Sequence, residues 1–410
     1  MRKTLNIARA AVLFSLAVAG LAHASGGSLD PAFGNGGIAI SNFGSPILVA
    51  DAILQSDGKI VAAISINESN FALARYLPNG ALDGGFGTTG FAQTSFANFN
   101  TPTSMAIQPD GKIVVAGAAT DDEQSFDFAV ARFNSNGSLD NTFGAGGKAT
   151  ASVTGLLTGA VVVIQPDGKI LVAGSALQFC RTCSPHLVLA RFNPNGSLDA
   201  TFANHGMVAE NNAMNPTTVA LNTAGGILVE GNSAIAEFSP GGSPSSQVTP
   251  AAIARSSNSG PAAFLPDGSF IVAEAVSDGS FRRRDTDTKV VRFTAIGNID
   301  PAFNSPLLDF SGEGSNSGDA SNAIAIQSNG QIIAVASHFS PGFTNELFSL
   351  ARLNPNGTLD PSFGSGGLVT TNVGGVEDVA AVLVQPDGKI VAIGTANNFS
   401  DVALVRYLGN

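Results

Sequence analysis

The only two cysteines of the chain lie in one short segment, Cys180-Arg181-Thr182-Cys183, with His186 three residues further on. Outside the cytoplasm a C-x-x-C pair favours a local disulfide, and we predict one between Cys180 and Cys183. The Cys-x2-Cys-x2-His pattern also fits a zinc site if one further ligand comes from elsewhere in the fold. A redox-active role is disfavoured, because the motif does not open a helix in a thioredoxin-like pattern.

Acidic side chains are concentrated in two other segments, residues 121–127 and 285–287. Carboxylate oxygens bind hard cations such as calcium, and the candidate ligands are Asp121, Asp122, Asp127, Asp285 and Asp287. Neither segment has the spacing and the glycine of a recognised calcium loop, so a solvated acidic loop is the simpler interpretation. We therefore expect no cofactor, with calcium as the alternative.

Signatures of catalysis are scarce in this sequence. Past residue 24 the only histidines are His186, His205 and His338, which lie in different parts of the chain. The G-x-S-x-G motif of serine hydrolases is absent. Residues 146–149 (GGKA) resemble a phosphate-binding loop, but the glycine spacing is wrong and the Ser or Thr is missing. The sequence therefore predicts no catalytic or cofactor-binding residue.

Residues 1–24 are predicted to be a signal peptide. Arg2, Lys3 and Arg9 form a basic start, residues 10–22 are apolar but too short to span a bilayer, and residues 22–24 (AHA) have the form of a cleavage site. We expect cleavage near Ala24 and a secreted, periplasmic or cell-surface protein with no membrane span. The formal net charge of -11 makes the chain a poor candidate for nucleic-acid binding.

One motif, Q-P-D-G-K-I-V-V-A-G in its fullest form, recurs along the chain. Its glycine supplies the positive φ that a tight hairpin turn needs. Successive turn glycines are 43 to 62 residues apart, which gives seven units, degenerate over about residues 222–345. The turn glycines are Gly58, Gly111, Gly168, Gly225, Gly268, Gly330 and Gly388.

Each unit is predicted to contain four short strands. In the second unit these are residues 104–108, 113–117, 128–133 and 148–153, which are separated by D-G and N-G turns and by loops. No sustained helical periodicity occurs past residue 24. Four strands in about 57 residues is the size of a propeller blade. The sequence therefore predicts an all-β, seven-bladed β-propeller of four-stranded blades over residues 25–410.

The two ends of the chain divide one copy of a second motif, A-R-F-N-x-N-G-S-L-D. Its second half comes first, at Leu29-Asp30, and its first half ends the chain at Val405-Arg406-Tyr407. We therefore expect residues 38–42 to be the outermost strand of the last blade. Such a strand closes the ring and removes the sheet edge that an open array exposes.

Within the second motif an Arg and an Asp lie eight residues apart. We predict a structural ion pair in each copy, because a partly buried guanidinium group matches a carboxylate well; arginines lining a ligand site are the alternative. The pairs are Arg75 with Asp83, Arg132 with Asp140, Arg191 with Asp199, Arg292 with Asp300, Arg352 with Asp360, and Arg406 with Asp30. The repeated phenylalanines are predicted to pack between blades: Phe33, Phe86, Phe143, Phe202, Phe303 and Phe363.

These motifs resemble the bacterial delta-60 repeat family. The matching patterns are L-D-x-x-F-G-x-x-G, Q-P-D-G-K-I-[VL]-[VA]-A-G and A-R-[FY]-N-x-N-G-[ST]-L-D, and they are strongest in units one to three and seven. The resemblance covers nearly all of residues 25–410. It implies a β-propeller of the kind found in exported bacterial proteins, and it implies no catalytic residue, because the family has no assigned activity.

The loops of such a propeller differ between its two faces. The uniform D-G-K and N-G turns share one face, whereas irregular loops and the connections between blades share the other. Variable loops on a rigid scaffold commonly carry function. We therefore predict a monomeric, non-enzymatic binding scaffold that holds a protein or a surface glycan on its irregular face. A hydrolase or lyase with a central-channel site and a purely structural envelope protein are the alternatives.

Overall fold

The computed structural model describes fourteen segments of the chain: residues 26–67, 69–121, 126–153, 155–177, 185–210, 214–231, 234–248, 259–265, 267–277, 286–295, 298–310, 319–339, 346–375 and 377–409. The expected signal segment and both cysteines lie outside them. Regular structure in the described part consists of strands, and no helix there is long and apolar enough to cross a membrane. This agrees with the missing helical periodicity.

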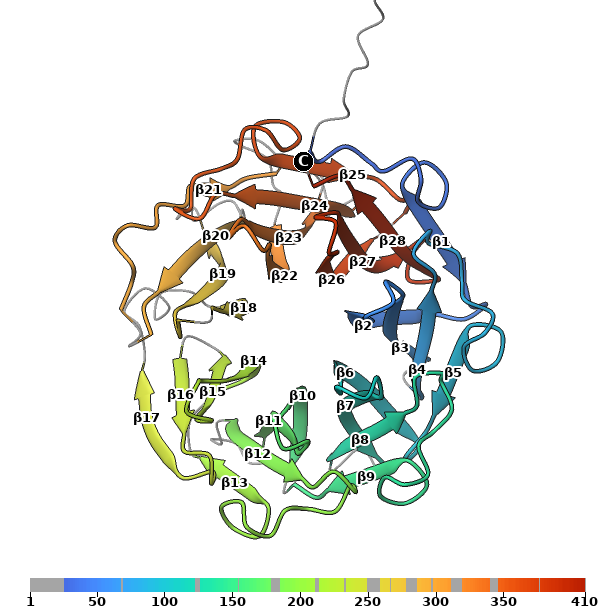
Figure 1. Cartoon of the computed structure of the whole chain (residues 1–410), viewed down its shortest axis with the longest axis vertical. Coiled ribbons are helices and arrows are strands. Elements are labelled where there is room, and N and C mark those ends of the chain that lie inside the picture. The colour runs from blue at the N-terminus through green and yellow to red at the C-terminus, as the bar shows by residue number, and fades with distance from the viewer. Residues whose placement is uncertain are drawn as a thin grey trace, which may run out of the picture.

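The strands form seven four-stranded antiparallel sheets arranged around a central channel (Figure 1). Each sheet is one blade, and its first strand in the chain lies innermost in blades 1 to 6. Blade 1 contains β2 (Ile47–Leu54), β3 (Ile60–Ile66), β4 (Phe71–Tyr76) and β5 (Phe91–Thr94). Blade 2 contains β6 (Phe99–Ile107), β7 (Ile113–Thr120), β8 (Asp127–Phe133) and β9 (Lys148–Ala151). Blade 3 contains β10 (Leu156–Ile164), β11 (Ile170–Leu177), β12 (His186–Phe192) and β13 (Met207–Glu210).

The remaining blades follow the same order. Blade 4 contains β14 (Pro216–Leu221), β15 (Ile227–Gly231), β16 (Ala234–Phe238) and β17 (Pro244–Val248). Blade 5 contains β18 (Ser259–Phe264), β19 (Phe270–Ser277), β20 (Thr286–Phe293) and β21 (Leu307–Leu308). Blade 6 contains β22 (Asp319–Ile326), β23 (Ile332–Phe339), β24 (Glu346–Leu353) and β25 (Leu368–Thr371). Blade 7 contains β26 (Asp378–Val384), β27 (Ile390–Ala396), β28 (Asp401–Tyr407) and β1 (Ile38–Asn42).

The blade-forming turns follow from the repeated glycine. In blade 2, Gly111 donates its N–H to the carbonyl of Gln108, and Asp110 Oδ1 accepts the N–H of Lys112. Gly111 has a φ of 82°, and the equivalent Gly58, Gly168, Gly225, Gly268, Gly330 and Gly388 have φ values between 79° and 84°. Side chains other than glycine rarely adopt this conformation. The turn glycines therefore count the blades correctly.

The first described strand closes the ring. β1 pairs antiparallel with β28, with Ile38 opposite Val405 and Asn42 opposite Asp401. The closure extends beyond the strands, because Gly27 N–H donates to the carbonyl of Leu408 at 2.8 Å. The predicted seven-bladed propeller and its closure by residues 38–42 are confirmed.

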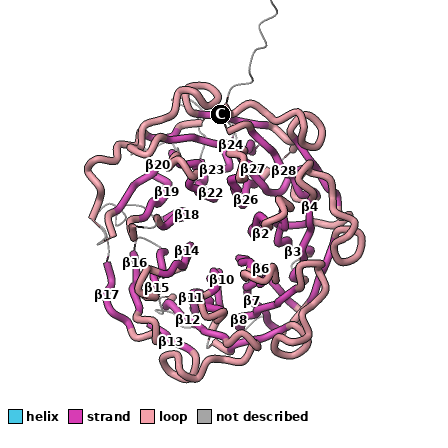
Figure 2. Tube along the Cα trace, in the orientation of Figure 1, coloured by secondary structure: helices cyan, strands magenta, loops and turns pink. Residues whose placement is uncertain are grey.

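The innermost strands of the blades line the central channel (Figure 2). Each shows a register shift against the second strand of its blade, as a β-bulge produces, for example between Pro102 and Ser104 in β6. Polar side chains beside the bulges bond to the next blade. Thr103 Oγ1 donates to the carbonyl of Ala160 at 2.6 Å, and Asp51 Oδ2 accepts the N–H of Met105 at 2.8 Å. These bonds link the innermost strands of blades 1, 2 and 3.

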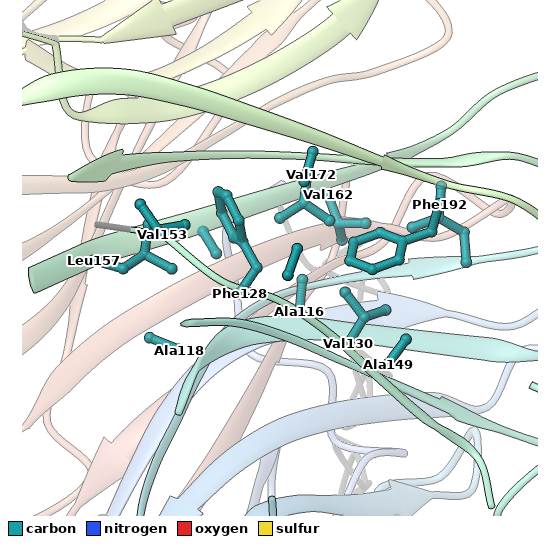
Figure 3. Close-up of a cluster of buried hydrophobic side chains, with 14 of the residues drawn as sticks. Ala116, Ala118, Phe128, Val130, Ala149, Val153, Leu157, Val162, Val172 and Phe192 are labelled. Carbon is teal, nitrogen blue, oxygen red and sulfur yellow. The ribbon is translucent and has the colours of Figure 1, made fainter. Parts of the chain in front are cut away.

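The core lies between blades, because both faces of each sheet pack against a neighbouring sheet. Figure 3 shows the cluster between blades 2 and 3, where Phe128 and Val130 of blade 2 pack against Val162, Val172 and Phe192 of blade 3. The second and third strands of most blades are buried over nearly their whole length, as in β7 and β12. This explains why the sequences of these strands are continuous apolar runs and do not alternate between apolar and polar residues.

Candidate functional site

The face that carries the uniform turns is occupied by a repeated arrangement that we call the Arg–Asp cluster. In blade 2, Arg132 Nε donates to Asp140 Oδ2 at 2.8 Å, and the guanidinium carbon lies 4.6 Å from the centre of the Phe143 ring. Lys112 Nζ approaches the same carboxylate oxygen at 3.4 Å. The eight-residue spacing therefore brings the two charges together, both of them buried.

Each complete cluster also bonds to the next blade. Arg132 Nη1 donates to the carbonyl of Pro194, in the N-G turn of blade 3, at 2.6 Å. The same bond joins Arg75 to Ser135, Arg191 to Pro240, Arg352 to Gly409 and Arg406 to Pro78. Arginine thus links blades 1 to 2, 2 to 3, 3 to 4, 6 to 7 and 7 to 1. Its groups are committed to the scaffold, which supports the structural interpretation.

The Asp140 carboxylate is held strongly in its ionised form. Burial acts to raise the pKa of Asp140, but the hydroxyl and the N–H of Thr142 and the charge of Arg132 outweigh it and lower the pKa to about 2. The pKa of Asp199 in blade 3 is lowered to about 2 in the same way, by Thr201 and Arg191 against the effect of burial.

The Arg–Asp cluster is incomplete in blades 4 and 5. Blade 4 has Glu237 in place of the arginine, and β17 begins six residues after β16 ends, so no loop is left to carry the Asp and the Phe. In blade 5, Arg292 Nε lies 3.6 Å from Asp300 Oδ2 and has no hydrogen-bond partner. Among the described residues no arginine bond links blade 4 to 5 or blade 5 to 6.

Two carboxyl groups that were not predicted from the sequence are buried between blades 4 and 5. Glu230 on β15 is fully buried and Glu274 on β19 is 4% exposed. The hydroxyl of Thr217 donates to Glu230 Oε2, whereas Oε1 of each glutamate has no hydrogen-bond partner. Burial raises the pKa of Glu230 to about 8, with the nearby Glu274 charge adding to it, and burial raises the pKa of Glu274 to about 7 against the charge of Lys289.

The repeat sequence contains a signal for Glu230 and Glu274. Each glutamate interrupts a strand that is apolar in the other repeats, where Ala63, Ala116 and Ala173 stand at the position of Glu230. A carboxyl group with a pKa near neutrality is a common property of catalytic sites. Here, however, neither side chain has the solvent access that a substrate needs.

The predicted cation ligands are not brought together in the described part of the chain. Asp121 Oδ1 accepts the N–H of Asn98, and Asp127 accepts the hydroxyl of Ser152 and the N–H of Val153. These bonds tie irregular loops to neighbouring strands. Asp287 lies in β20, on another blade. No group of three His, Cys, Asp or Glu side chains suited to a metal occurs among the described residues, which exclude Asp122, Asp285, Cys180 and Cys183.

Two cavities flank the connection between blades 7 and 1. The larger, which we call the rim groove, has a volume of about 1010 Å³ and follows the outermost strand of blade 1. It is lined by Asn42, Phe43, Ile66, Leu82, Gly85, Gly87, Thr88, Thr89, Phe91, Ala92, Gln93, Phe133, Asn136, Gly137, Ser138 and Leu139. None of these side chains is ionisable.

The smaller cavity, the Phe399 pocket, lies at the other end of the same connection and measures about 430 Å³. It is lined by Pro46, Ile47, Leu48, Ser65, Asn67 and Phe399. Leu48 is 44% exposed and Phe399 is 36% exposed, and few other large apolar side chains among the described residues are as exposed. The pocket is on the irregular face, because it includes the loop between β27 and β28.

The backbone beside this pocket is strained. Asn397, Asn398 and Phe399 follow one another with φ values of 53°, 59° and 62°, in the left-handed region. Such conformations cost on the order of 1 kcal/mol or more per residue, and they cluster at functional sites. The buried Asp401 carboxylate holds the loop by accepting the side-chain amides of Asn42 and Asn397. The protein therefore maintains a strained loop that displays Phe399.

Five segments match the model of the beta-propeller family described as a domain of unknown function (DUF5122): residues 55–86, 108–143, 165–202, 327–363 and 385–410. These repeats belong to the DUF5122 β-propeller family. The match confirms the expected relation to a propeller repeat family without an assigned activity. It omits residues 203–326, which contain the incomplete clusters of blades 4 and 5. Among curated protein sequences no relative is found.

Solved structures share the architecture at low sequence identity. Virginiamycin B lyase from Staphylococcus aureus, in a catalytically inactive form with quinupristin, is 10% identical, covers 90% of this chain and 99% of its own, and has a TM-score of 0.51. A protein of unknown function from Bacteroides caccae is 14% identical over 80% of this chain and 95% of its own, with a TM-score of 0.43. The extracellular domain of a putative hybrid two-component system from B. thetaiotaomicron is 11% identical over 90% of this chain and 40% of its own, with a TM-score of 0.46. At these identities the likeness concerns the fold alone.

Proposed function

We propose that this protein is an exported, non-enzymatic scaffold that binds a protein or a surface glycan through its irregular face. The Phe399 pocket carries the proposal. It combines a cavity, two exposed apolar side chains and a run of strained residues beside the channel-lining strand β2. The opposite face supports the same reading, since its repeated charged groups bond to neighbouring blades rather than to solvent.

Export is part of this proposal and rests on the composition of residues 1–24. A surface or periplasmic location is compatible with binding an envelope glycan or an envelope protein. The net charge of -11 disfavours nucleic acid as the partner.

The test is thermal unfolding of the purified protein with calcium, a chelator, polysaccharides and peptidoglycan fragments. A ligand at a hundred times its dissociation constant stabilises the folded state by about 2.7 kcal/mol. We expect one panel member to raise the Tm, and we expect the double substitution L48S/F399S to abolish that rise. Release of a product from the panel, detected by mass spectrometry, points instead to the hydrolase or lyase. If no panel member changes the Tm, the remaining alternative is a purely structural envelope protein.

A further inference from the structure

The rim groove differs in chemistry from the rest of the molecule. The chain has 31 acidic and 20 basic residues, yet none of them lines this groove. Its polar side chains are the amides of Asn42, Gln93 and Asn136 and the hydroxyls of Thr88, Thr89 and Ser138. Amides and hydroxyls both donate and accept hydrogen bonds without charge. A ligand that matches them is neutral and rich in hydroxyl groups.

An aromatic pair forms the apolar part of the groove. The ring centres of Phe43 and Phe91 are 5.7 Å apart, with 38° between the ring planes. Both rings are partly exposed, and both pack against the core cluster between blades 7 and 1, which fixes their positions. The negative face of an aromatic ring attracts the slightly positive C–H groups of an apolar surface. One side of a pyranose ring presents such a C–H surface, while its hydroxyls remain free to bond at the edge.

The repeat provides internal comparisons at the same positions. Between blades 1 and 2 the equivalent residues are Phe96 and Lys148, and Lys148 Nζ lies 5.7 Å from the Phe96 ring centre while donating to the carbonyl of Ser95. The ammonium group therefore covers the face of the Phe96 ring that a ligand would contact. Between blades 2 and 3 the equivalents are Val153 and Met207, which line a cavity of about 650 Å³ that contains no Phe, Tyr or Trp. In these three junctions an open aromatic pair occurs only between blades 7 and 1.

We propose that the rim groove binds a neutral saccharide chain, with Phe43 and Phe91 as its stacking platform and Gln93 and Asn136 as hydrogen-bonding groups. The inference rests on the proposed binding function and names a ligand class for it, at a second site on the rim that includes the N-G turn of blade 2, residues 136–137. A volume of about 1010 Å³ lies at the upper end of the range for small-ligand pockets and suits several linked sugar units. The groove and the Phe399 pocket lie at the two ends of the same inter-blade connection, residues 43–46.

The experiment is isothermal titration of the full-length protein with three neutral hexasaccharides, cellohexaose, xylohexaose and mannohexaose, and with the anionic hexagalacturonate. We expect at least one neutral chain to bind and hexagalacturonate to bind at least tenfold more weakly. F43A and F91A should each reduce the affinity at least tenfold, and F91Y should stay within about threefold of wild type. The matched control is M207A in the equivalent cavity, which should change the affinity less than twofold.

A further variant distinguishes loss of binding from loss of the fold. Gln93 is exposed on β5, so Q93A should weaken binding about threefold with an unaltered Tm. Failure of all three neutral chains to bind, preference for hexagalacturonate, or binding that survives both F43A and F91A overturns the inference. Failure of all three neutral chains leaves as the rival occupant an extended peptide that pairs with the outer edge of β5 through its backbone. The broader binding function fails separately, through the L48S/F399S result.

Discussion

Blades 1 to 3 and blades 4 to 5 have the same fold but are held together differently. Between blades 2 and 3 a large apolar cluster is combined with the arginine bond from Arg132 to the next turn. Between blades 4 and 5 the described residues include five buried apolar side chains, two buried carboxyl groups and no arginine bond. The ring is therefore complete without an arginine bond at every junction.

This difference explains where the sequence degenerates. The Arg, Asp and Phe of the cluster act together, since the carboxylate fixes the guanidinium group that covers the aromatic ring. Once blade 4 has lost the loop between its last two strands, no part of the cluster can form there. A region with fewer buried contacts is also expected to open locally before the rest. The following predictions test this contrast, from the largest effect to the smallest.

Removing one arginine should separate the two regions most clearly. R132A leaves the buried Asp140 carboxylate without its main partner, and we expect a loss of about 3 kcal/mol or more of unfolding free energy. R292A, the equivalent change in blade 5, removes a half-buried and loosely paired side chain and should cost under about 1 kcal/mol. Urea unfolding measures both values. Equal losses would show that the cluster contributes no more in blade 2 than in blade 5.

The buried glutamates should make the junction between blades 4 and 5 less stable as pH rises towards 8. The folded pKa of Glu230 is about 8, against an ordinary value of 4.5. The folded state therefore holds a proton that the unfolded chain releases, and stability falls as pH rises from about 4.5 to about 8. E230Q keeps the shape of the protonated group and removes this dependence. We expect a gain of about 2 kcal/mol or more at pH 8 and almost none at pH 4.5, measured by thermal unfolding at each pH.

The carboxylates of the complete clusters should act in the opposite direction. The folded pKa values of Asp140 and Asp199 are about 2, below the ordinary value of 3.8. Their stabilisation is fully present above pH 3.8 and is lost as pH falls towards 2, at most about 2 kcal/mol for each group. D140N should therefore flatten the acid limb of the stability profile between pH 4 and 2. An unchanged limb in this variant would mean that other groups govern acid unfolding.

The turns should not distinguish the two regions. Gly111 in blade 2 and Gly268 in blade 5 share a φ of 82°. Replacement of either by alanine forces a side chain into a left-handed conformation, at a cost of about 1 kcal/mol. We expect G111A and G268A to lose the same stability in urea unfolding within error. A clearly larger loss in G111A would place part of the regional difference in the turns.

The architecture was accessible from sequence because its signals are local and repeated. The glycine of the first turn marks each blade even where the residues around it diverge from D-G-K, as at Gly268 and Gly330. The division of one motif between Asp30 and Arg406 predicted the closure, and the two side chains form an ion pair 2.9 Å long. The Arg–Asp spacing was informative for the same reason: both groups lie in one motif.

The candidate site could not be found in this way. The rim groove and the Phe399 pocket combine residues near positions 43, 91, 137 and 399, and no spacing relates them before the ring is closed. Glu230 and Glu274 lie near each other only because successive residues of a strand point to opposite faces of its sheet. Glu274 is one position further along its repeat than Glu230, so the two side chains enter the same junction from opposite blades. The bonds from Arg132 to Pro194 also escaped prediction, since they join different repeats. Local patterns thus predicted the blades, whereas contacts between blades required the structure.

The pairing of β1 with β28 also constrains the order of events during folding. The two strands are joined by residues such as Asn42 and Asp401, which are 359 positions apart. On the ribosome, β1 must wait without a partner until β28 has been synthesised. Every shorter length is an open arc with two unpaired ends, and only a chain that includes both strands can become a ring. A product terminated before β28 is therefore not a smaller propeller. It is a fragment with unpaired strand edges, prone to associate with other copies of itself.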